Sequence, residues 1–139
     1  MERAGSMTGG YYTSSDAIVM VYDASEPSTL TSCVSWKDEA KRYAKPEPVY
    51  FLAGNKCDKI HDIEVDERTA YNFAEKHNIP RENVFRISAK SGKGVNEMFL
   101  SILSKLSTSP KPYDKIDHVV PTFEDAYRED NKEKKGCSC

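Results

Sequence analysis

This sequence of 139 residues lacks long apolar runs, an excess of basic charge and a set of paired cysteines. No apolar run approaches the roughly 20 residues of a membrane-spanning helix, and MERAGSMTGG at the N-terminus lacks the apolar core of a signal peptide. The formal net charge of −2 provides no positive field for binding nucleic acids. The four cysteines form no disulfide framework, since two of them close the chain, and this usage indicates a reducing, cytosolic compartment.

The sequence also offers no pattern for a metal site. The three histidines, His61, His77 and His118, have no cysteine or acidic partners at the spacing of metal ligands. We therefore expect no metal-binding residues in this chain and interpret the histidines as surface or packing residues.

Three apolar runs predict strands: DAIVMVYD at residues 16–23, VYFLAG at 49–54 and VFRIS at 84–88. Nearly continuous apolar runs of this length are typical of parallel strands that are buried on both faces. We therefore expect three parallel strands with little alternation between inward and outward residues.

A helical pattern follows each predicted strand. The first helix occupies residues 25–44, with Ser25 as its cap, Pro27 in its first turn and Lys45-Pro46 beyond its end. Asp66 is expected to cap the second helix. The third helix carries an apolar stripe of Val95, Met98, Phe99, Ile102, Leu103 and Leu106. Alternating strands and helices predict an α/β fold, with a parallel sheet covered by helices on both faces.

The helical periodicity ends near residue 107, and the remaining sequence is polar and rich in proline. We interpret residues 1–108 as the folded domain. Residues 109–139 are interpreted as a flexible tail, with one helical turn near residues 123–128 and a terminal Cys-Ser-Cys.

Two polar loops follow neighbouring strands and predict a site for guanine. The first contains Asn55, Lys56 and Asp58, and the second is Ser88-Ala89-Lys90. Loops at the carboxyl ends of parallel strands meet at one edge of the sheet, where ligands bind. A solvated turn is the alternative for Asn-Lys-x-Asp taken alone, but the second loop after the next strand favours a binding site.

The side chains in these loops suit guanine and not adenine. The Asp58 carboxylate can accept hydrogen bonds from the ring N–H and the exocyclic amino group of guanine together, and adenine offers no such pair of donors. Asn55 can bond the base and tie the loop to its neighbours, and the stem of Lys56 can lie over the ring. The backbone N–H of Ala89 can donate to the guanine carbonyl. A site of this kind rejects the wrong base, because its own polar groups would be left unpaired.

With these motifs, the chain resembles the C-terminal two-thirds of a small GTPase of the Ras superfamily, most closely the Rab branch. The resemblance rests on AGNKCDK, ISAKSGKGVNEMF, the stretch from Glu2 and Arg3 through Tyr11-Tyr12 to Tyr22-Asp23, and the terminal Cys-Ser-Cys. It implies a three-layer sheet of the P-loop GTPase kind, here incomplete, with the three C-terminal strand–helix units. It also implies GTP or GDP as ligand, magnesium and GTP hydrolysis in complete members, and a role in vesicle-mediated protein transport.

The chain differs from the family pattern in the residues that bind the phosphates. Gly5 and Gly10 have the glycine spacing of the phosphate loop, but Tyr11-Tyr12 follow where the family has Lys-Ser or Lys-Thr. The family's first switch has no counterpart here, and its catalytic glutamine would fall on Met1. We therefore expect base specificity without catalytic residues, in a chain that looks N-terminally truncated. The missing strands are also expected to leave the flank of residues 16–23 as an open, apolar sheet edge.

The terminal cysteines, Cys137 and Cys139, resemble the double cysteine that carries two geranylgeranyl groups in Rab proteins. Free thiols or a chance metal pair are the alternatives. The resemblance implies effectors and the prenylation escort machinery as partners, and a place on the cytoplasmic face of intracellular membranes with a cytosolic pool. Two functions remain open: a part of a Rab-like switch protein, or a prenylated interaction module without catalytic activity.

Overall fold

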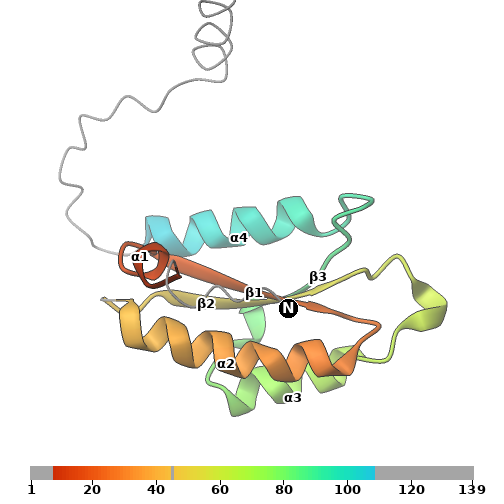
Figure 1. Cartoon of the computed structure of the whole chain (residues 1–139). Coiled ribbons are helices and arrows are strands. Elements are labelled where there is room, and N and C mark those ends of the chain that lie inside the picture. Colours follow the sequence, from red (N-terminus) through yellow and green to blue (C-terminus); the bar gives the residue numbers. More distant parts are fainter. Residues whose placement is uncertain (1–7, 45, 109–139) are drawn as a thin grey trace, which may run out of the picture. The chain divides into compact units, whose positions relative to one another are not determined.

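The computed structural model describes residues 8–44 and 46–108, and within them a parallel sheet has the strand order β1-β2-β3 (Figure 1). The predicted tail, with its helical turn and its two cysteines, lies outside the described residues, as does Met1. The predicted alternation of strands and helices is confirmed. The strands are β1 (Ala17–Asp23), β2 (Val49–Asn55) and β3 (Val84–Arg86), and the helices are α1 (Thr8–Tyr12), α2 (Pro27–Tyr43), α3 (Glu67–Lys76) and α4 (Val95–Ser107), with short 3₁₀ turns η1 (Ile60–Asp62) and η2 (Arg81–Asn83).

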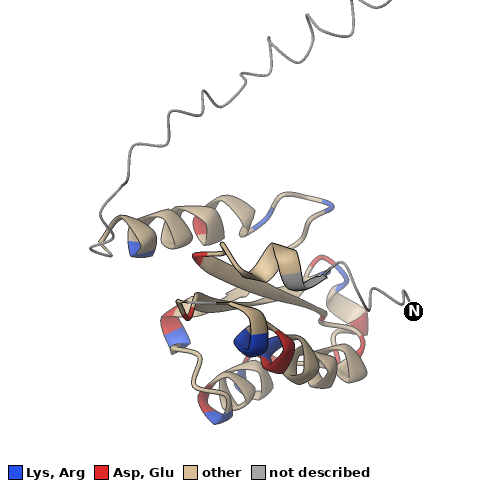
Figure 2. Ribbon diagram, turned by 60° about the vertical axis from the view of Figure 1, so that its left-hand side comes forward, with Lys and Arg blue, Asp and Glu red and all other residues tan. Residues whose placement is uncertain are grey.

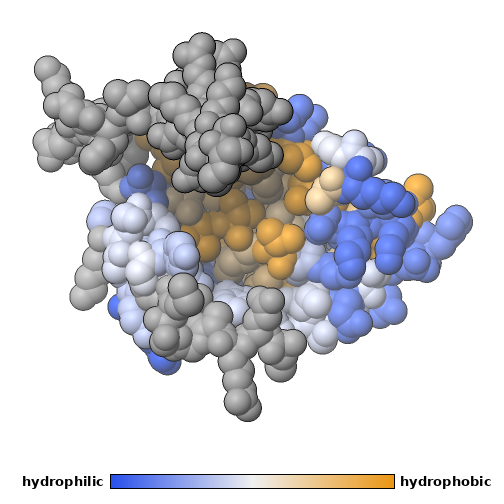
Figure 3. All heavy atoms as spheres, turned by 45° about the horizontal axis from the view of Figure 1, so that its top comes forward, coloured by the Kyte–Doolittle hydropathy of each residue, from blue (hydrophilic) through white to orange (hydrophobic). Residues whose placement is uncertain are grey.

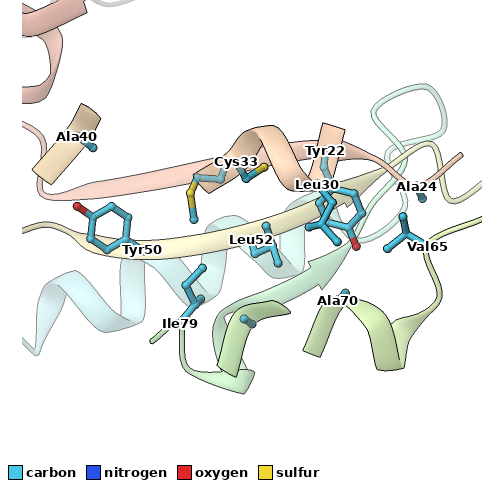
Figure 4. Packing of buried hydrophobic residues seen from close by; sticks show 12 residues of the cluster. Tyr22, Ala24, Leu30, Cys33, Ala40, Tyr50, Leu52, Val65, Ala70 and Ile79 are labelled. Atoms are coloured by element: carbon cyan, nitrogen blue, oxygen red, sulfur yellow. The ribbon is translucent and has the colours of Figure 1, made fainter. Parts of the chain in front are cut away.

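Helices cover both faces of the sheet, as predicted, and each face has its own apolar cluster. On one face, α2 and α3 pack against β1 and β2 through residues such as Leu30 and Leu52 (Figure 4). On the other face, Met98 and Ile102 of α4 pack against Phe51. The described part of the chain is therefore three layers deep, with β2 at its centre.

The expectation that every strand is buried on both faces is correct only for β2. Five consecutive residues of β2, from Tyr50 to Gly54, are buried. In β1, Val21 is exposed, and in β3, Arg86 is exposed. The difference follows from position, because β1 and β3 are the two edges of the sheet, and among the described helices only α4 covers the second face. Within residues 8–44 and 46–108, β1 pairs with a strand on one side only.

The beginning of α2 differs from the prediction. Glu26 occupies the cap position and makes no side-chain cap bond, and Pro27 occupies the first turn as expected. Ser25 instead donates from its backbone N–H and its hydroxyl to Asp23 Oδ1, at 2.9 and 2.6 Å. Ser25 therefore stabilises the loop after β1 and does not cap the helix.

A buried lysine joins α2 to α3, and the apolar pattern gave no sign of it. Lys37 lies on the inner face of α2 and donates from Nζ to the backbone oxygen of His77, where α3 ends. Its ammonium lies 4.9 Å from the centre of the Tyr50 ring. Burial lowers the pKa of Lys37, and the carbonyl and the ring compensate part of that cost.

The caps and stripes of the later helices are confirmed in part. Asp66 caps α3 as predicted, accepting from the Thr69 backbone N–H at 2.7 Å. In α4, Met98 and Ile102 are buried, but Phe99 and Leu103 are exposed by 55% and 63%. The sheet therefore buries only part of the apolar stripe of α4, and the rest is exposed in the described part of the chain.

Candidate functional site

The loops that follow β2 and β3 are joined by backbone hydrogen bonds. The N–H of Ile87 donates to Gly54 O at 2.8 Å, and the N–H of Cys57 donates to Ile87 O at 3.1 Å. The residues of Asn55–Asp58 and Ser88–Lys90 therefore lie side by side at the carboxyl edge of the sheet, as the sequence predicts.

Gly54 is required where the first loop leaves the strand. A Cβ atom at this position would lie 2.5 Å from the Tyr22 hydroxyl oxygen and 2.7 Å from its ring. Tyr22 is itself buried, and desolvation raises the pKa of its hydroxyl to about 12. The glycine therefore lets a buried aromatic ring pack directly against the strand that carries the loop.

Asn55 is the tie between the two loops. Its Oδ1 accepts from the backbone N–H of Lys56 at 2.8 Å and from the backbone N–H of Ala89 at 3.0 Å. The second bond differs from our expectation that the Ala89 N–H faces the guanine carbonyl. In this structure that donor is occupied within the protein, so reading the carbonyl requires it to turn from Asn55 to the base.

Asp58 is held by Ser88, which is fully buried. The Ser88 hydroxyl donates to Asp58 Oδ1 at 2.6 Å and accepts from the Ser91 backbone N–H at 3.2 Å. The bond from Ser88 is the main reason that the pKa of the Asp58 carboxyl is lowered, so Asp58 is ionised at neutral pH and can only accept hydrogen bonds. The carboxylate is therefore both oriented and charged.

Lys56 has a left-handed backbone conformation, with φ of 66°. Its Nζ forms an ion pair with Asp23 Oδ2, at the end of the neighbouring strand, where Asp23 is paired in register with Asn55. The Lys56 and Ser25 hydrogen bonds lower the pKa of the Asp23 carboxyl to about 2. Our expectation was that the lysine stem lies over a base; here the ammonium is directed to Asp23.

Asp23 and Ser25 were not predicted to lie at the binding site. A signal was available, because Asp23 ends a predicted parallel strand, and such strands end at the same edge of a sheet. The structure adds a third loop, after β1, to the two that were predicted.

Two glycines shape the loop between Ser88 and α4. Gly92 and Gly94 both have positive φ, of 80° and 74°. The backbone N–H of Ser88 donates to Lys93 O at 2.9 Å, and that of Gly92 donates to Ser88 O at 2.8 Å. A Cβ atom on Gly94 would lie 2.4 Å from the backbone oxygen of Arg86. The loop therefore turns back tightly on itself and fixes Ser88 under Asp58.

Charged residues and possible metal ligands are scattered over the part of the chain that the structure describes. Each of the helices α2, α3 and α4 carries both basic and acidic residues (Figure 2). Within residues 8–44 and 46–108, no three His, Cys, Asp or Glu side chains are grouped to hold a metal ion. None of the helices in these ranges is long and apolar enough to cross a membrane.

Comparison with known proteins gives one consistent result. The model of the Ras family matches residues 1–108. Ras-related protein Rab-1D of Dictyostelium discoideum is 33% identical over 123 residues, 84% of this chain and 58% of the relative. Human Ras-related protein Rab-22A is 34% identical, over 78% of this chain and 54% of the relative, and GTP-binding protein YPTM1 of Zea mays is 32% identical, over 78% and 50%. The chain spans about half the length of these relatives.

Proposed function

Because this chain belongs to the Ras family and is Rab-like, we propose that it is the guanine-recognising part of a GTP-binding switch protein of vesicle trafficking. Asn55, Lys56, Asp58, Ser88, Ala89 and Lys90 are proposed as its nucleotide-binding residues. GTP hydrolysis belongs to the proposed function of the whole protein, and no residue of this chain is assigned a catalytic role.

The observation that carries the proposal is the oriented carboxylate of Asp58. Ser88 donates to one of its oxygens at 2.6 Å, and no other side chain of the described residues donates to this carboxylate. Asp58 is exposed, so a base can approach it edge-on. An ionised carboxylate in this position suits the two adjacent donors of guanine.

Base recognition and phosphate binding are separable in this proposal. Phosphates are commonly held by backbone N–H groups of a glycine-rich loop and a helix N-terminus, and magnesium by oxygen ligands beside them. No Gly-x-x-x-x-Gly-Lys-Ser/Thr occurs in this chain. We therefore assign specificity for the base to these residues, and expect affinity for the phosphates and magnesium to depend on regions of the relatives that this chain does not span.

Equilibrium titration of the 139-residue chain with GDP and with ADP tests the proposal. The two ligands carry the same phosphates, so a difference in affinity reports the base alone. We expect GDP to bind at least about tenfold more tightly, since this ratio corresponds to about 1.4 kcal/mol of hydrogen bonding. Equal affinity for GDP and ADP would show that the loops do not recognise the base.

We further propose that Cys137 and Cys139 both carry geranylgeranyl groups in the cell, and that residues 109–139 form the tether between these lipids and the domain. Two lipid chains give stable membrane anchoring where one gives marginal binding, at about 0.8 kcal/mol per buried CH₂. Intact-mass analysis of membrane and soluble fractions is expected to find two added groups in the membrane fraction. The matched control is the Cys137→Ser, Cys139→Ser double variant, and its unchanged recovery in membranes would contradict lipid anchoring.

A further inference from the structure

A groove runs beside the C-terminal half of α3 and the loop that follows this helix. All the residues that line it lie between Tyr71 and Arg81, so one continuous and fully described segment forms it. Its volume is about 610 Å³, within the roughly 300–1,000 Å³ of ligand sites in proteins. We call it the α3 groove.

A second hollow continues the α3 groove toward the start of the helix. It has a volume of about 230 Å³, shares Tyr71 and Arg81 with the groove and is bordered by Arg68. From Arg68 to Lys76 the helix rises by about 12 Å, which is the length of three to four residues in an extended chain. The two hollows together therefore offer room for a short extended peptide.

The α3 groove is separate from the proposed guanine site and from the apolar surface of α4. The turn η2 leads from Arg81 directly into β3, so this end of the groove lies at the amino end of the strand, whereas the guanine loops follow the carboxyl ends. α3 packs on the sheet face that carries α2, and α4 packs on the other face. With the α4 side turned forward, Figure 3 shows hydrophobic residues gathered there between polar ones.

The guanidinium of Arg81 is oriented within the groove but has no acceptor. Its central carbon lies 4.0 Å from the centre of the Tyr71 ring, and Arg81 is exposed. A guanidinium on an aromatic face keeps its N–H donors available. In the part of the chain that the structure describes, no group accepts a hydrogen bond from it or pairs with it. The nearby acids are engaged elsewhere, because Glu67 accepts from the Tyr71 hydroxyl at 2.7 Å and Glu82 pairs with Lys105 at 3.0 Å.

The rest of the lining suits a peptide backbone. Asn72 and Asn78 line the groove, and a side-chain amide offers the donors and the acceptor that complement a peptide C=O and N–H. Asn78 has φ of 55° and turns the chain at the end of α3, which brings Ile79 and Pro80 into the lining as an apolar wall. Glu75 also lines the groove, and its charge opposes a doubly charged phosphate more than a single carboxylate.

We propose that the α3 groove binds an extended, acidic peptide segment of a partner protein. The carboxylate of an Asp or Glu side chain in this segment accepts two hydrogen bonds from Arg81, whose planar fork matches a carboxylate. Asn72 and Asn78 bond the peptide backbone beside that residue, and Arg68 attracts a second acidic side chain at the other end of the groove. This interaction surface adds a protein partner to the proposed recognition of guanine.

Peptide selection on the full chain tests the proposal. A displayed library of random short peptides is first depleted on the Arg81→Gln variant and then selected on the original chain, which removes peptides that bind elsewhere. We expect the selected peptides to share an Asp or Glu residue. A synthetic copy of such a peptide is expected to bind the Arg81→Gln variant at least about tenfold more weakly, because a bidentate, charge-assisted pair is lost.

The matched control is Arg42→Gln on α2, which removes an exposed arginine outside the groove and is expected to leave the affinity unchanged. Arg81→Lys keeps the charge but loses the planar fork, so its affinity should fall between those of the original chain and Arg81→Gln. Replacing the acid of the peptide by its amide should weaken binding to the original chain about tenfold and to Arg81→Gln only slightly, since the pair is already broken there. Circular dichroism checks that all variants remain folded.

Two-dimensional ¹H–¹⁵N NMR of the full chain locates the bound peptide. The amide signals of residues 71–81 are expected to shift, and those of residues 55–58 and 88–90 to stay in place, with GDP present or absent. A selection that retains no peptide after depletion, retained peptides without a shared acid, an Arg81→Gln variant that binds as tightly as the original chain, or shifts confined to other residues would each overturn the proposal.

Discussion

Replacing Asp58 by asparagine is expected to weaken GDP binding by about 100-fold or more and to transfer the preference to xanthosine diphosphate. Two hydrogen bonds from guanine to an ionised carboxylate are each worth about 1.5–3 kcal/mol, and the variant replaces one acceptor oxygen by a donor amide. Xanthine carries a carbonyl where guanine carries its amino group, so it can accept from that amide. Titration of the original chain and the variant with both diphosphates measures the exchange.

The Asp58→Asn substitution preserves the support of the loop, which makes it a sharp test. The side-chain amide oxygen that it introduces can still accept from the Ser88 hydroxyl, so we expect a similar melting temperature. Because the pKa of Asp58 is lowered, GDP binding by the original chain should persist at mildly acidic pH and be lost only as the pH falls through that lowered value. A variant that still prefers GDP over xanthosine diphosphate would show that Asp58 does not contact the base.

Gly94→Ala is expected to destabilise the fold strongly. The residue has φ of 74°, and the new Cβ atom would lie 2.4 Å from the backbone oxygen of Arg86, which cannot rotate away as a side chain would. Strain in the left-handed region costs about 1–3 kcal/mol by itself, and the clash adds to it. We expect the free energy of unfolding in urea to fall by about 3 kcal/mol or more.

Gly92→Ala is the matched control for this prediction. Its φ is 80°, so it carries the same backbone strain, but no atom lies within 4 Å of its Cβ position. Its loss of stability should be limited to the backbone strain, about 1–2 kcal/mol. Equal losses in the two variants would mean that the loop moves away from Arg86 and does not hold Ser88 as the structure indicates.

The order of the elements and the meeting of the two loops could be predicted from the sequence because both depend on local patterns. Apolar runs of strand length, Pro27 and the Asp66 cap each act within a few residues. Parallel pairing then brings the strand ends together without further information. The predicted convergence of Asn55 with Ser88–Lys90 therefore followed from topology.

The predictions that failed depend on what lies across the sheet or across a loop. Ser25 has the side chain of a helix cap, but the Asp23 carboxylate competes successfully for it. The bond from the Ala89 N–H to Asn55 was likewise not predicted, because its partners are 34 residues apart, and the contact of this N–H with guanine stays a prediction. Lys37 is buried because a helix end 40 residues later supplies an acceptor for its ammonium. No local pattern contains these long-range partners.

The most direct measurement of base recognition is a two-dimensional ¹H–¹⁵N NMR titration of the full chain with GDP and, in parallel, with ADP. GDP is expected to shift the amide signals of residues 55–58 and 88–90, with Ala89 among the largest changes as its N–H moves from Asn55 to the guanine carbonyl. ADP is expected to leave these signals in place. Equal shifts with both nucleotides, or shifts confined to other parts of the chain, would contradict the assignment of these loops to guanine.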